Sequence, residues 1–574
     1  MLHCSLVLII IGGCITWWDA ERGNMILNPH TEVSEFTDKD GTIFHLPFNV
    51  TLDTFMVDYY PGSVLPRGYT SRLLINGQSH TLSMNRIISV AGYRFNQSGY
   101  HGDGSSVIGV NHDPWGIGVT YGGYILFAVS GMWLLVNPRG RFRSLLRCTL
   151  AFASLVMTTM PARAVEGISK SDADDAGCRQ VLYNGRVAPL NSVATEFALK
   201  VTGSKRFRDT SPEQLMLSVM LYPDNWVNEP LIKIKDARLR DSLGVTHSHA
   251  SLSELFDSDR QYRLRGLYHG GDGLVDKAIE DVDERVEVIL RLRQGELFQP
   301  LPQGMQRLSD FRVRLEILYN TLPFSTVLFV SLFTLALGMF VTVLFYRRII
   351  PRLTYTLLSL ILIWGVAFYA LRWIIAGSVP MGSAAETLLL LSLLLISLSM
   401  TMVHRHPTIA ALGTLMAGCA ALVSHLSLSN PAVTPTIPVL QSPWLGIHVT
   451  LVMASYALLA FTAVISIVAL CRPDAQHRLA RLSVVILYPG VMLLGAGIFT
   501  GAVWANTAWG RYWDWDPKET WALISMIVYA VPLHHSLMPL TRPRRLHIYL
   551  LCAIASILMT YFGVNYLPSL HAYS

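Results

Sequence analysis

Long apolar runs recur along most of this chain, and they restrict its possible folds more than any other feature. A helix needs about 20 apolar residues to cross a bilayer. Runs of about that length lie near residues 2–18, 117–136, 145–162, 323–346, 353–376, 384–403, 408–425, 444–470, 482–504, 519–539 and 546–567. Only 15% of the 574 residues are charged, whereas soluble proteins carry about 25%. The sequence therefore predicts a polytopic α-helical membrane protein with about 11 spans.

The short segments between the runs alternate between arginine-rich and uncharged ones. The basic junctions contain Arg139, Arg141, Arg143, Arg147, Arg347, Arg348, Arg352, Arg405, Arg472, Arg478, Arg481, Arg542, Arg544 and Arg545. Loops such as 377–383 and 426–442 contain no Lys or Arg. By the positive-inside rule, short basic loops stay in the cytoplasm. With about eleven spans every basic junction lies inside, while the C-terminus and both large polar regions lie outside.

Charge and cysteine usage exclude two function classes. Many arginines lie in the short junctions, so the formal net charge of +6 does not indicate nucleic-acid binding. The seven cysteines include no Cys-x-x-Cys pair. The sequence therefore does not predict a thiol oxidoreductase, and it lacks the Cys-x-x-Cys-His signature of covalent haem attachment.

Two long polar regions separate the apolar runs. Residues 19–116 are predicted to be β-rich, because Asn76-Gly77 is a strong turn signal between the arms of a hairpin over 72–84. Residues 163–322 are predicted to be mixed, with helical stretches such as 277–292. Neither region contains internal repeats, a glycine-rich phosphate loop or a nucleophile motif.

A dense tryptophan block, Trp509–Trp521, lies in an external segment between two apolar runs. It contains four tryptophans in thirteen residues, together with five charged side chains. An aromatic belt at the membrane interface is one interpretation. A belt accounts for scattered aromatic residues, however, and not for so dense a block. The alternative is a flat platform for a large planar ligand.

Four histidines draw attention because of where the topology places them. His448 and His571 lie near the outer face, on the same side as the tryptophan block. His3 begins the first run, and His534 lies about 15 residues into a predicted span, roughly 22 Å deep, so these two lie toward the inner side. Neutral imidazole ligates metals and haem iron. Taken singly, each could instead be a satisfied core or interface residue, and His535 is a rival to His534.

The C-terminal half resembles a known family. Residues 509–519, WGRYWDWDPKE, resemble the WWD signature of haem-handling membrane proteins. Residues 373–386, 438–448, 533–534 and 570–573 resemble further segments of the CcsA (ResC) proteins, including their two external histidines and one intramembrane histidine.

The N-terminal part resembles CcsB (ResB). The similarity includes His3, Gly12–Thr16, Tyr59–Ser63, Gly92–Ser98 and Asn111–Trp115. The whole chain therefore resembles the fused CcsB–CcsA cytochrome c synthases of System II. Members of that family usually carry one more span ahead of the one that begins here at His3. The His-x-Arg often found at the intramembrane histidine is His534-His535-Ser536 in this chain.

The resemblance implies an organisation in three parts. These are a ResB-like part (1–162) with two spans after its external domain (19–116), a mixed external domain (163–322), and a CcsA-like bundle (323–574) with the WWD segment near 504–519. It also implies haem transport to an external site and covalent attachment of haem to the Cys-x-x-Cys-His segment of an apocytochrome c. This activity would be that of a holocytochrome c synthase of the lyase type.

The resemblance also implies roles for particular residues. The haem iron would be held axially by an inner and an outer pair, His3/His534 and His448/His571. Arg511 and Lys518 are the expected propionate partners. Ring packing, loop conformation and catalysis are expected to depend on Trp509, Gly510, Trp513, Trp515, Asp516 and Glu519, with Asp514 also positioning the loop.

The expected cofactor, transiently bound as substrate, is haem b. Expected partners are apocytochrome c, an extracytoplasmic thiol reductant and membrane lipid, with no nucleic acid. The expected location is the bacterial inner membrane, with the active site on the periplasmic side. Three other functions fit parts of the pattern: a haem exporter or chaperone without ligase activity, a dihaem electron-transfer protein, and a transporter of another planar substrate.

Overall fold

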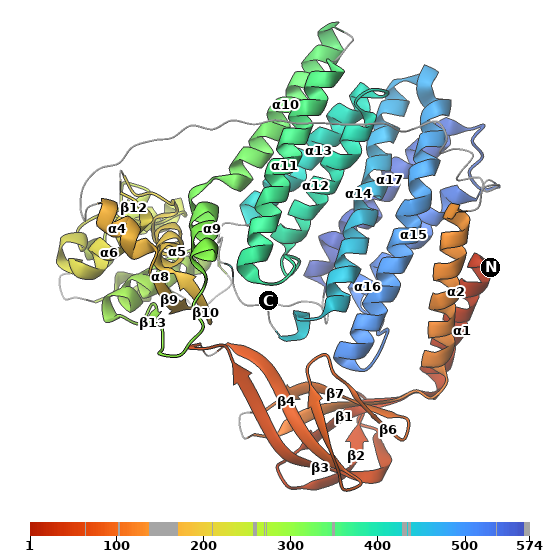
Figure 1. The fold of residues 1–574 in the computed structure, drawn as a ribbon, viewed down its shortest axis with the longest axis horizontal. Coiled ribbons are helices and arrows are strands. Elements are labelled where there is room, and N and C mark those ends of the chain that lie inside the picture. The colour runs from red at the N-terminus through yellow and green to blue at the C-terminus, as the bar shows by residue number, and fades with distance from the viewer. Residues whose placement is uncertain are drawn as a thin grey trace.

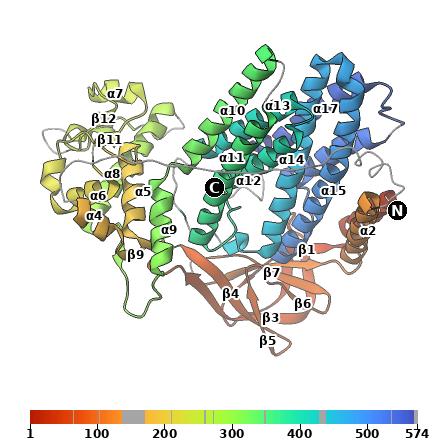
Figure 2. The same ribbon diagram turned by 45° about the horizontal axis from the view of Figure 1, so that its top comes forward.

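The chain folds into a helical bundle, a β-rich region at one end of the bundle and a mixed region beside it (Figures 1 and 2). This computed structural model describes residues 1–63, 65–101, 104–136, 170–208, 210–256, 261–268, 270, 273–346, 350–427, 433, 438–534 and 536–567. The predicted span over 145–162 lies outside the described residues, as do His535 and His571.

Within the described ranges, eight helices are long and apolar enough to cross a membrane. They are α1 (Leu2–Asp19), α2 (Gly116–Val136), α10 (Phe324–Tyr346), α11 (Pro351–Ala376), α12 (Ala384–Met402), α13 (Pro407–Ser427), α14 (Pro443–Cys471) and α15 (Gln476–Trp509). The prediction of a polytopic helical membrane protein is confirmed.

The last two predicted spans differ from expectation in length. The run over 519–539 is the 14-residue helix α16 (Pro517–Ala530), followed by the short 3₁₀ turn η6 (Val531–Leu533). Pro532 lacks the amide proton that would continue the α-helix, so α16 ends there. As a result His534 lies just beyond the end of a helix, and not within one as predicted. The run over 546–567 is α17 (Pro543–Tyr561).

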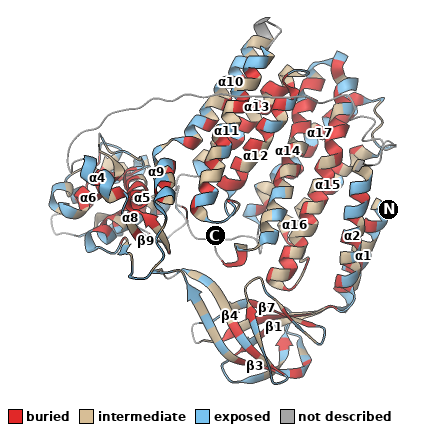
Figure 3. Cartoon of the chain, viewed as in Figure 1, coloured by how far each residue is buried: buried red, intermediate tan, exposed pale blue. Residues whose placement is uncertain are grey.

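The central helices of the bundle are the most buried (Figure 3). In α14 and α15 about 70% of the apolar window is buried, against 17% in α1. Small residues let these helices approach closely, and buried hydroxyls bond across them. Ser455 on α14, for example, donates to the Gly490 carbonyl oxygen on α15 at 2.8 Å. Helix α2 joins this core through Tyr124 and Phe499, whose rings stack with centroids 4.4 Å apart.

The β-rich region is one eight-stranded antiparallel sheet in the order β5-β4-β3-β2-β1-β8-β7-β6. Its strands are β1 (Glu21–Leu27), β2 (Glu32–Thr37), β3 (Ile43–Tyr59), β4 (Pro66–Ile75), β5 (Gln78–Ser83), β6 (Ile88–Val90), β7 (Tyr93–Tyr100) and β8 (Ser106–His112). Its core includes the fully buried Leu27, Leu52 and Phe95. The predicted hairpin is β4–β5, in which Asn76 and Gly77 both have positive φ, as a two-residue primed turn requires.

The mixed region contains helices around two small sheets, β10-β9-β13 and β11-β12. Its elements are α4 (Lys170–Gly177), β9 (Gln180–Tyr183), β10 (Arg186–Pro189), α5 (Leu190–Thr202), α6 (Pro212–Leu221), η1 (Pro223–Trp226), β11 (Ile232–Lys233), α7 (Ala237–Leu243), β12 (His249–Ala250), η2 (Ser253–Leu255), η3 (Arg263–Gly266), α8 (Leu274–Gln294), β13 (Gln299–Pro300) and α9 (Asp310–Thr321). The helical stretch predicted over 277–292 lies within α8. Helix α9 leads into the bundle at α10.

Candidate functional site

The tryptophan block includes the end of α15, the loop 510–516 and the start of α16, and it lies next to the β-rich region (Figure 1). Helix α15 ends at Gly510, whose φ of +70° is left-handed. Helix α16 begins with a capping box in which Asp516 accepts from the Lys518 amide at 2.9 Å. Glu519 completes the box and also accepts from the Asp514 amide at 2.9 Å. These carboxylates therefore hold the backbone of the loop.

Charged side chains of the loop pair with one another and with the β-rich region. Arg511 Nη1 donates to Asp514 Oδ1 at 3.0 Å. Lys39, which follows β2, lies 3.8 Å from the other carboxylate oxygen of Asp514. Such partly exposed pairs contribute little stability, but together they orient Arg511 along the loop.

The three central tryptophans of the prediction lie in different environments. Trp513 is partly buried against the bundle, and Trp515 packs edge-on against it with centroids 5.7 Å apart. Trp515 is 67% exposed and has a φ of +58°, which is an outlier for a bulky residue. Trp509 packs against Trp504 with centroids 4.9 Å apart.

A cavity of about 350 Å³ lies beneath this loop. Its walls include His448 and Tyr456 of α14, Trp504 of α15, and Trp513. Further lining residues are Met381, Gly382, Ser383, Ala384, Thr387, Gly501, Tyr512, Lys518, Glu519, Thr560 and Tyr561. The cavity thus combines one imidazole, two indoles and a cation, which are groups suited to a flat, anionic, metal-containing ligand.

Trp504 was not predicted as a site residue. It lies at the end of the apolar run over 482–504. Tryptophan is common at the ends of membrane spans, so its position there does not indicate a binding site. Of the two cations predicted to meet the propionates, Lys518 lines the cavity, and Arg511 is bonded to Asp514. Burial lowers the pKa of Lys518, while the nearby carboxylate of Asp516 opposes that shift.

His448 is held in one tautomer by the backbone of α15. Its Nδ1 lies 2.7 Å from the carbonyl oxygen of Gly497, which can only accept, so the ring proton lies on Nδ1. The lone pair is then on Nε2, as ligation requires. A Cβ at Gly501 would lie 2.6 Å from His448 Nδ1. Glycine at 501 therefore makes room for the imidazole between the two helices.

The structure brings His3 and His534 together at the edge of the bundle. Their Nε2 atoms lie 3.2 Å apart, and their ring centroids 5.5 Å apart. His534 Nδ1 donates to the Ala530 carbonyl oxygen at 3.1 Å, so its Nε2 carries the lone pair. Metal–imidazole bonds are about 2.0–2.1 Å long. An ion between the two rings would therefore require Nε2 atoms about 4 Å apart, slightly farther than here.

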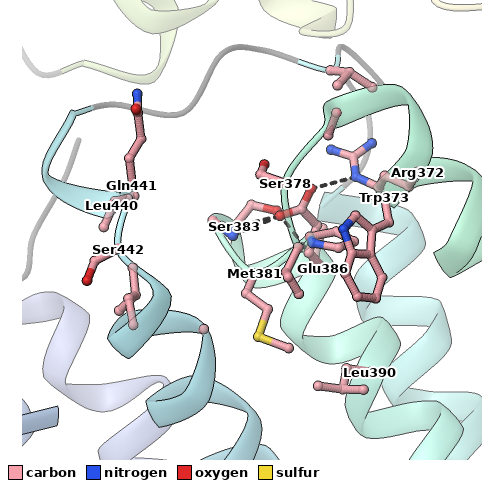
Figure 4. A pocket seen from close by; sticks show the side chains of 18 of the residues that line it. Arg372, Trp373, Ser378, Met381, Ser383, Glu386, Leu390, Leu440, Gln441 and Ser442 are labelled. Carbon is pink, nitrogen blue, oxygen red and sulfur yellow. Dashed lines mark hydrogen bonds and ion pairs between the residues drawn. The ribbon is translucent and has the colours of Figure 1, made fainter. Parts of the chain in front are cut away.

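A larger cavity of about 1530 Å³ lies beside the first. It is lined by residues of all three parts, including Tyr60, Arg186 and Gln441, and it shares the wall 381–384 with the smaller cavity. Figure 4 shows an ion pair in the lining of this cavity, in which Arg372 Nε donates to Glu386 Oε1 at 2.6 Å. Glu386 Oε2 accepts from the Gly382 amide at 2.9 Å, which holds the loop of the shared wall.

Comparison with known proteins supports the same grouping of parts. Residues 1–120 match the model of the ResB-like family, and residues 328–571 match that of the Cytochrome C assembly protein family. The chain is 30% identical to Protein NrfI of Wolinella succinogenes, over 92% of this chain and 71% of the relative. The chain belongs to the fused ResB–CcsA family of cytochrome c biogenesis proteins.

Part of this chain also matches relatives that are named CcsA. It is 34% identical to Cytochrome c biogenesis protein CcsA of Synechococcus sp. (strain CC9902), over 35% of this chain and 80% of the relative. It is 33% identical to the protein of the same name from Chlamydomonas reinhardtii, over 39% of this chain and 68% of the relative. The predicted family is confirmed, and with it a multi-pass membrane protein of cytochrome c biogenesis that handles haem.

Proposed function

We propose that this chain is a holocytochrome c synthase of a bacterial inner membrane. It takes haem b at an inner site, moves it to an external site and attaches it covalently to the Cys-x-x-Cys-His segment of an apocytochrome c. The observation that carries this proposal is the cavity in which His448, Trp513 and Lys518 meet. An exporter or chaperone without ligase activity is the main alternative.

The inner site would consist of His3 and His534. Both side chains are exposed at the edge of the bundle, so a ligand reaches them without opening the core. The Nε2 lone pair of His534 already faces His3. A separation of the rings by about 1 Å would accommodate iron.

The outer site would use His448 as one axial ligand and His571, which lies outside the described residues, as the other. Trp513 and Trp504 provide apolar ring surface, and Lys518 offers an ammonium to a propionate. Gly510, Asp516 and Glu519 act indirectly, because they hold the loop that carries Trp513.

Attachment would proceed mainly by proximity. Each cysteine S–H adds across one vinyl C=C bond, forming a C–S bond and a C–H bond, with no net oxidation or reduction. The addition needs free thiols, which an extracytoplasmic reductant supplies. The histidine of the incoming segment replaces one axial imidazole and so brings both thiols next to the vinyl groups. The larger cavity, of about 1530 Å³, is the proposed approach of this segment to the shared wall at 381–384.

Co-expression with an apocytochrome tests this function. In a host stripped of its own maturation system, the chain should produce a cytochrome whose haem survives denaturation. Its covalent haem is measured by peroxidase staining after electrophoresis. A cytochrome that stays apo while this protein is folded and haem-loaded would favour the exporter instead.

A further inference from the structure

Two glycine–threonine pairs hold α1 and α2 together. Gly12 and Thr16 lie one turn apart on α1, and Gly116 and Thr120 lie one turn apart on α2. A Cβ at Gly12 would lie 2.2 Å from Thr120 Oγ1, and one at Gly116 would lie 2.0 Å from Thr16 Oγ1. Each glycine therefore receives the threonine of the other helix, as in close helix pairs in membranes. The two hydroxyls are thereby brought to one place.

The side chain of Tyr512 enters that place from the tryptophan-rich loop. Its hydroxyl oxygen lies 2.6 Å from Thr16 Oγ1, and Thr120 Oγ1 donates to it at 3.2 Å. Thr16 Oγ1 in turn donates to Asp113 Oδ2 at 2.6 Å. All four side chains are buried.

The direction of each bond follows from the donor inventory. A hydroxyl donates one proton, and Thr16 gives its own to the carboxylate of Asp113. The Tyr512 hydroxyl must therefore donate to Thr16, and it accepts from Thr120. The result is a directed chain of bonds that ends on a carboxylate, and bonds to a charged acceptor are the stronger kind. Asp113 Oδ1 also accepts from the Gly116 amide at 2.8 Å, which fixes the carboxylate.

Further contacts from the ResB-like part fix the segment just before Tyr512. Asn111 Nδ2 donates to the Gly510 carbonyl oxygen at 2.7 Å. Arg94 Nη1 donates to Asn506 Oδ1 at 2.9 Å. A Cβ at Gly510 would lie 2.8 Å from the side-chain amide of Asn96, so the loop rests directly on the sheet.

We propose that Tyr512 is a positioning residue through which the ResB-like part sets the conformation of the tryptophan-rich loop, and so the shape of the outer haem site. The next residue, Trp513, lines the cavity with His448. A shift of the Tyr512 ring therefore moves an indole of the site. This inference rests on the proposed function, because the outer haem site is part of that proposal.

The test compares Tyr512→Phe with Tyr549→Phe in the full-length protein. Tyr549, on α17, donates its hydroxyl to the Val528 carbonyl oxygen at 2.8 Å and so loses one bond of similar kind away from the loop. The first readout is amide hydrogen exchange over 507–516 in haem-free protein. Loss of the two buried hydrogen bonds of the Tyr512 hydroxyl should raise exchange there by at least about fivefold in Tyr512→Phe, with no change in Tyr549→Phe.

The second readout is the reduced-minus-oxidised spectrum of haem-loaded protein, together with the yield of covalent cytochrome. Both should change in Tyr512→Phe and stay at the wild-type level in Tyr549→Phe. Thr16→Val should change both readouts in the same direction. The effects of Thr16→Val and Tyr512→Phe should add to less than their sum, because both substitutions remove the bond between Tyr512 and Thr16.

Unchanged exchange over 507–516 in Tyr512→Phe would overturn the inference. So would faster exchange with an unaltered haem spectrum, because the contact would then stabilise the loop without shaping the site. An equal effect of Tyr549→Phe would likewise count against it. If wild-type protein yields no covalent product, the synthase proposal fails by itself, and exchange and haem spectrum still decide the role of Tyr512.

Discussion

His3 and His534 face each other with their Nε2 atoms 3.2 Å apart, although 531 positions separate them in the chain. One belongs to the ResB-like part and the other to the CcsA-like part. An inner site built from this pair therefore exists only when both parts are assembled, as they are in the fused family.

Replacing His534 should empty the inner site. His534→Ala removes one of the two imidazoles, so purified protein should contain several-fold less haem by pyridine haemochrome assay, and cytochrome yield should fall with it. His425→Ala is a suitable control, because His425 bonds to Ser325, at the start of α10 and near the end of α13. Unchanged haem content in His534→Ala would contradict the assignment.

Adding one methyl group at position 501 should disturb the outer site without removing any ligand. A Cβ there would lie 2.6 Å from His448 Nδ1, so Gly501→Ala should displace the imidazole. We expect a shifted haem spectrum and roughly tenfold less covalent cytochrome, as expected for a reacting group displaced by about 1 Å or less. Gly446→Ala is the matched control, since a Cβ there meets nothing within 4 Å. Alanine favours a helix over glycine by about 1 kcal/mol, so lost helix stability would not account for the effect.

The predicted topology has a direct chemical test. In a background without the seven native cysteines, a single cysteine at Trp515 should react with an impermeant maleimide added outside. One at Asp474, in the turn between α14 and α15, should react only after the membrane is opened. Labelling of Asp474→Cys from outside would contradict the predicted orientation. It would also contradict the assignment of the histidines to inner and outer pairs, which depends on that orientation.

The mixed region should become less stable as pH rises. Burial raises the pKa of Glu196 on α5 to about 7, and the hydroxyl of Tyr183 partly offsets that shift. The folded state then binds a proton more tightly than the unfolded state. Its free energy of unfolding should fall between about pH 4.5 and pH 7, by at most about 3 kcal/mol.

Glu196→Gln should flatten this pH dependence, because glutamine has no proton to lose. Scanning calorimetry of the full chain at pH 5 and pH 8 provides the comparison. The wild-type transition of this region should move down between the two values and that of the variant should stay. Equal shifts in both proteins would show that another group is responsible.

Local signals predicted most of the helices and the β4–β5 hairpin. A 20-residue apolar run and an Asn-Gly turn are each contained in a short stretch of sequence, so a single chain suffices to find them. Helix α16 was predicted too long, because the run over 519–539 remains apolar past Pro532, where the helix stops.

Long-range contacts could not be predicted in the same way. Tyr512 and Thr16 lie 496 positions apart, and no sequence pattern in either segment indicates that they are in contact. Trp504 was missed for a related reason, because only the packing of α14 against α15 turns it toward His448 and the cavity. The pairing of Arg511 with Asp514 likewise depends on how the loop bends.

The backbone conformation of Trp515 indicates that the loop is less stable than it could be. A left-handed φ of +58° is unfavourable for a large side chain and easy for glycine. Trp515→Gly should therefore relax the loop, while removing an indole that is largely open to solvent. We expect such a variant to be more stable to heat but less active in haem handling. Selection of this protein for thermal stability alone would therefore favour loss of the exposed indole of Trp515.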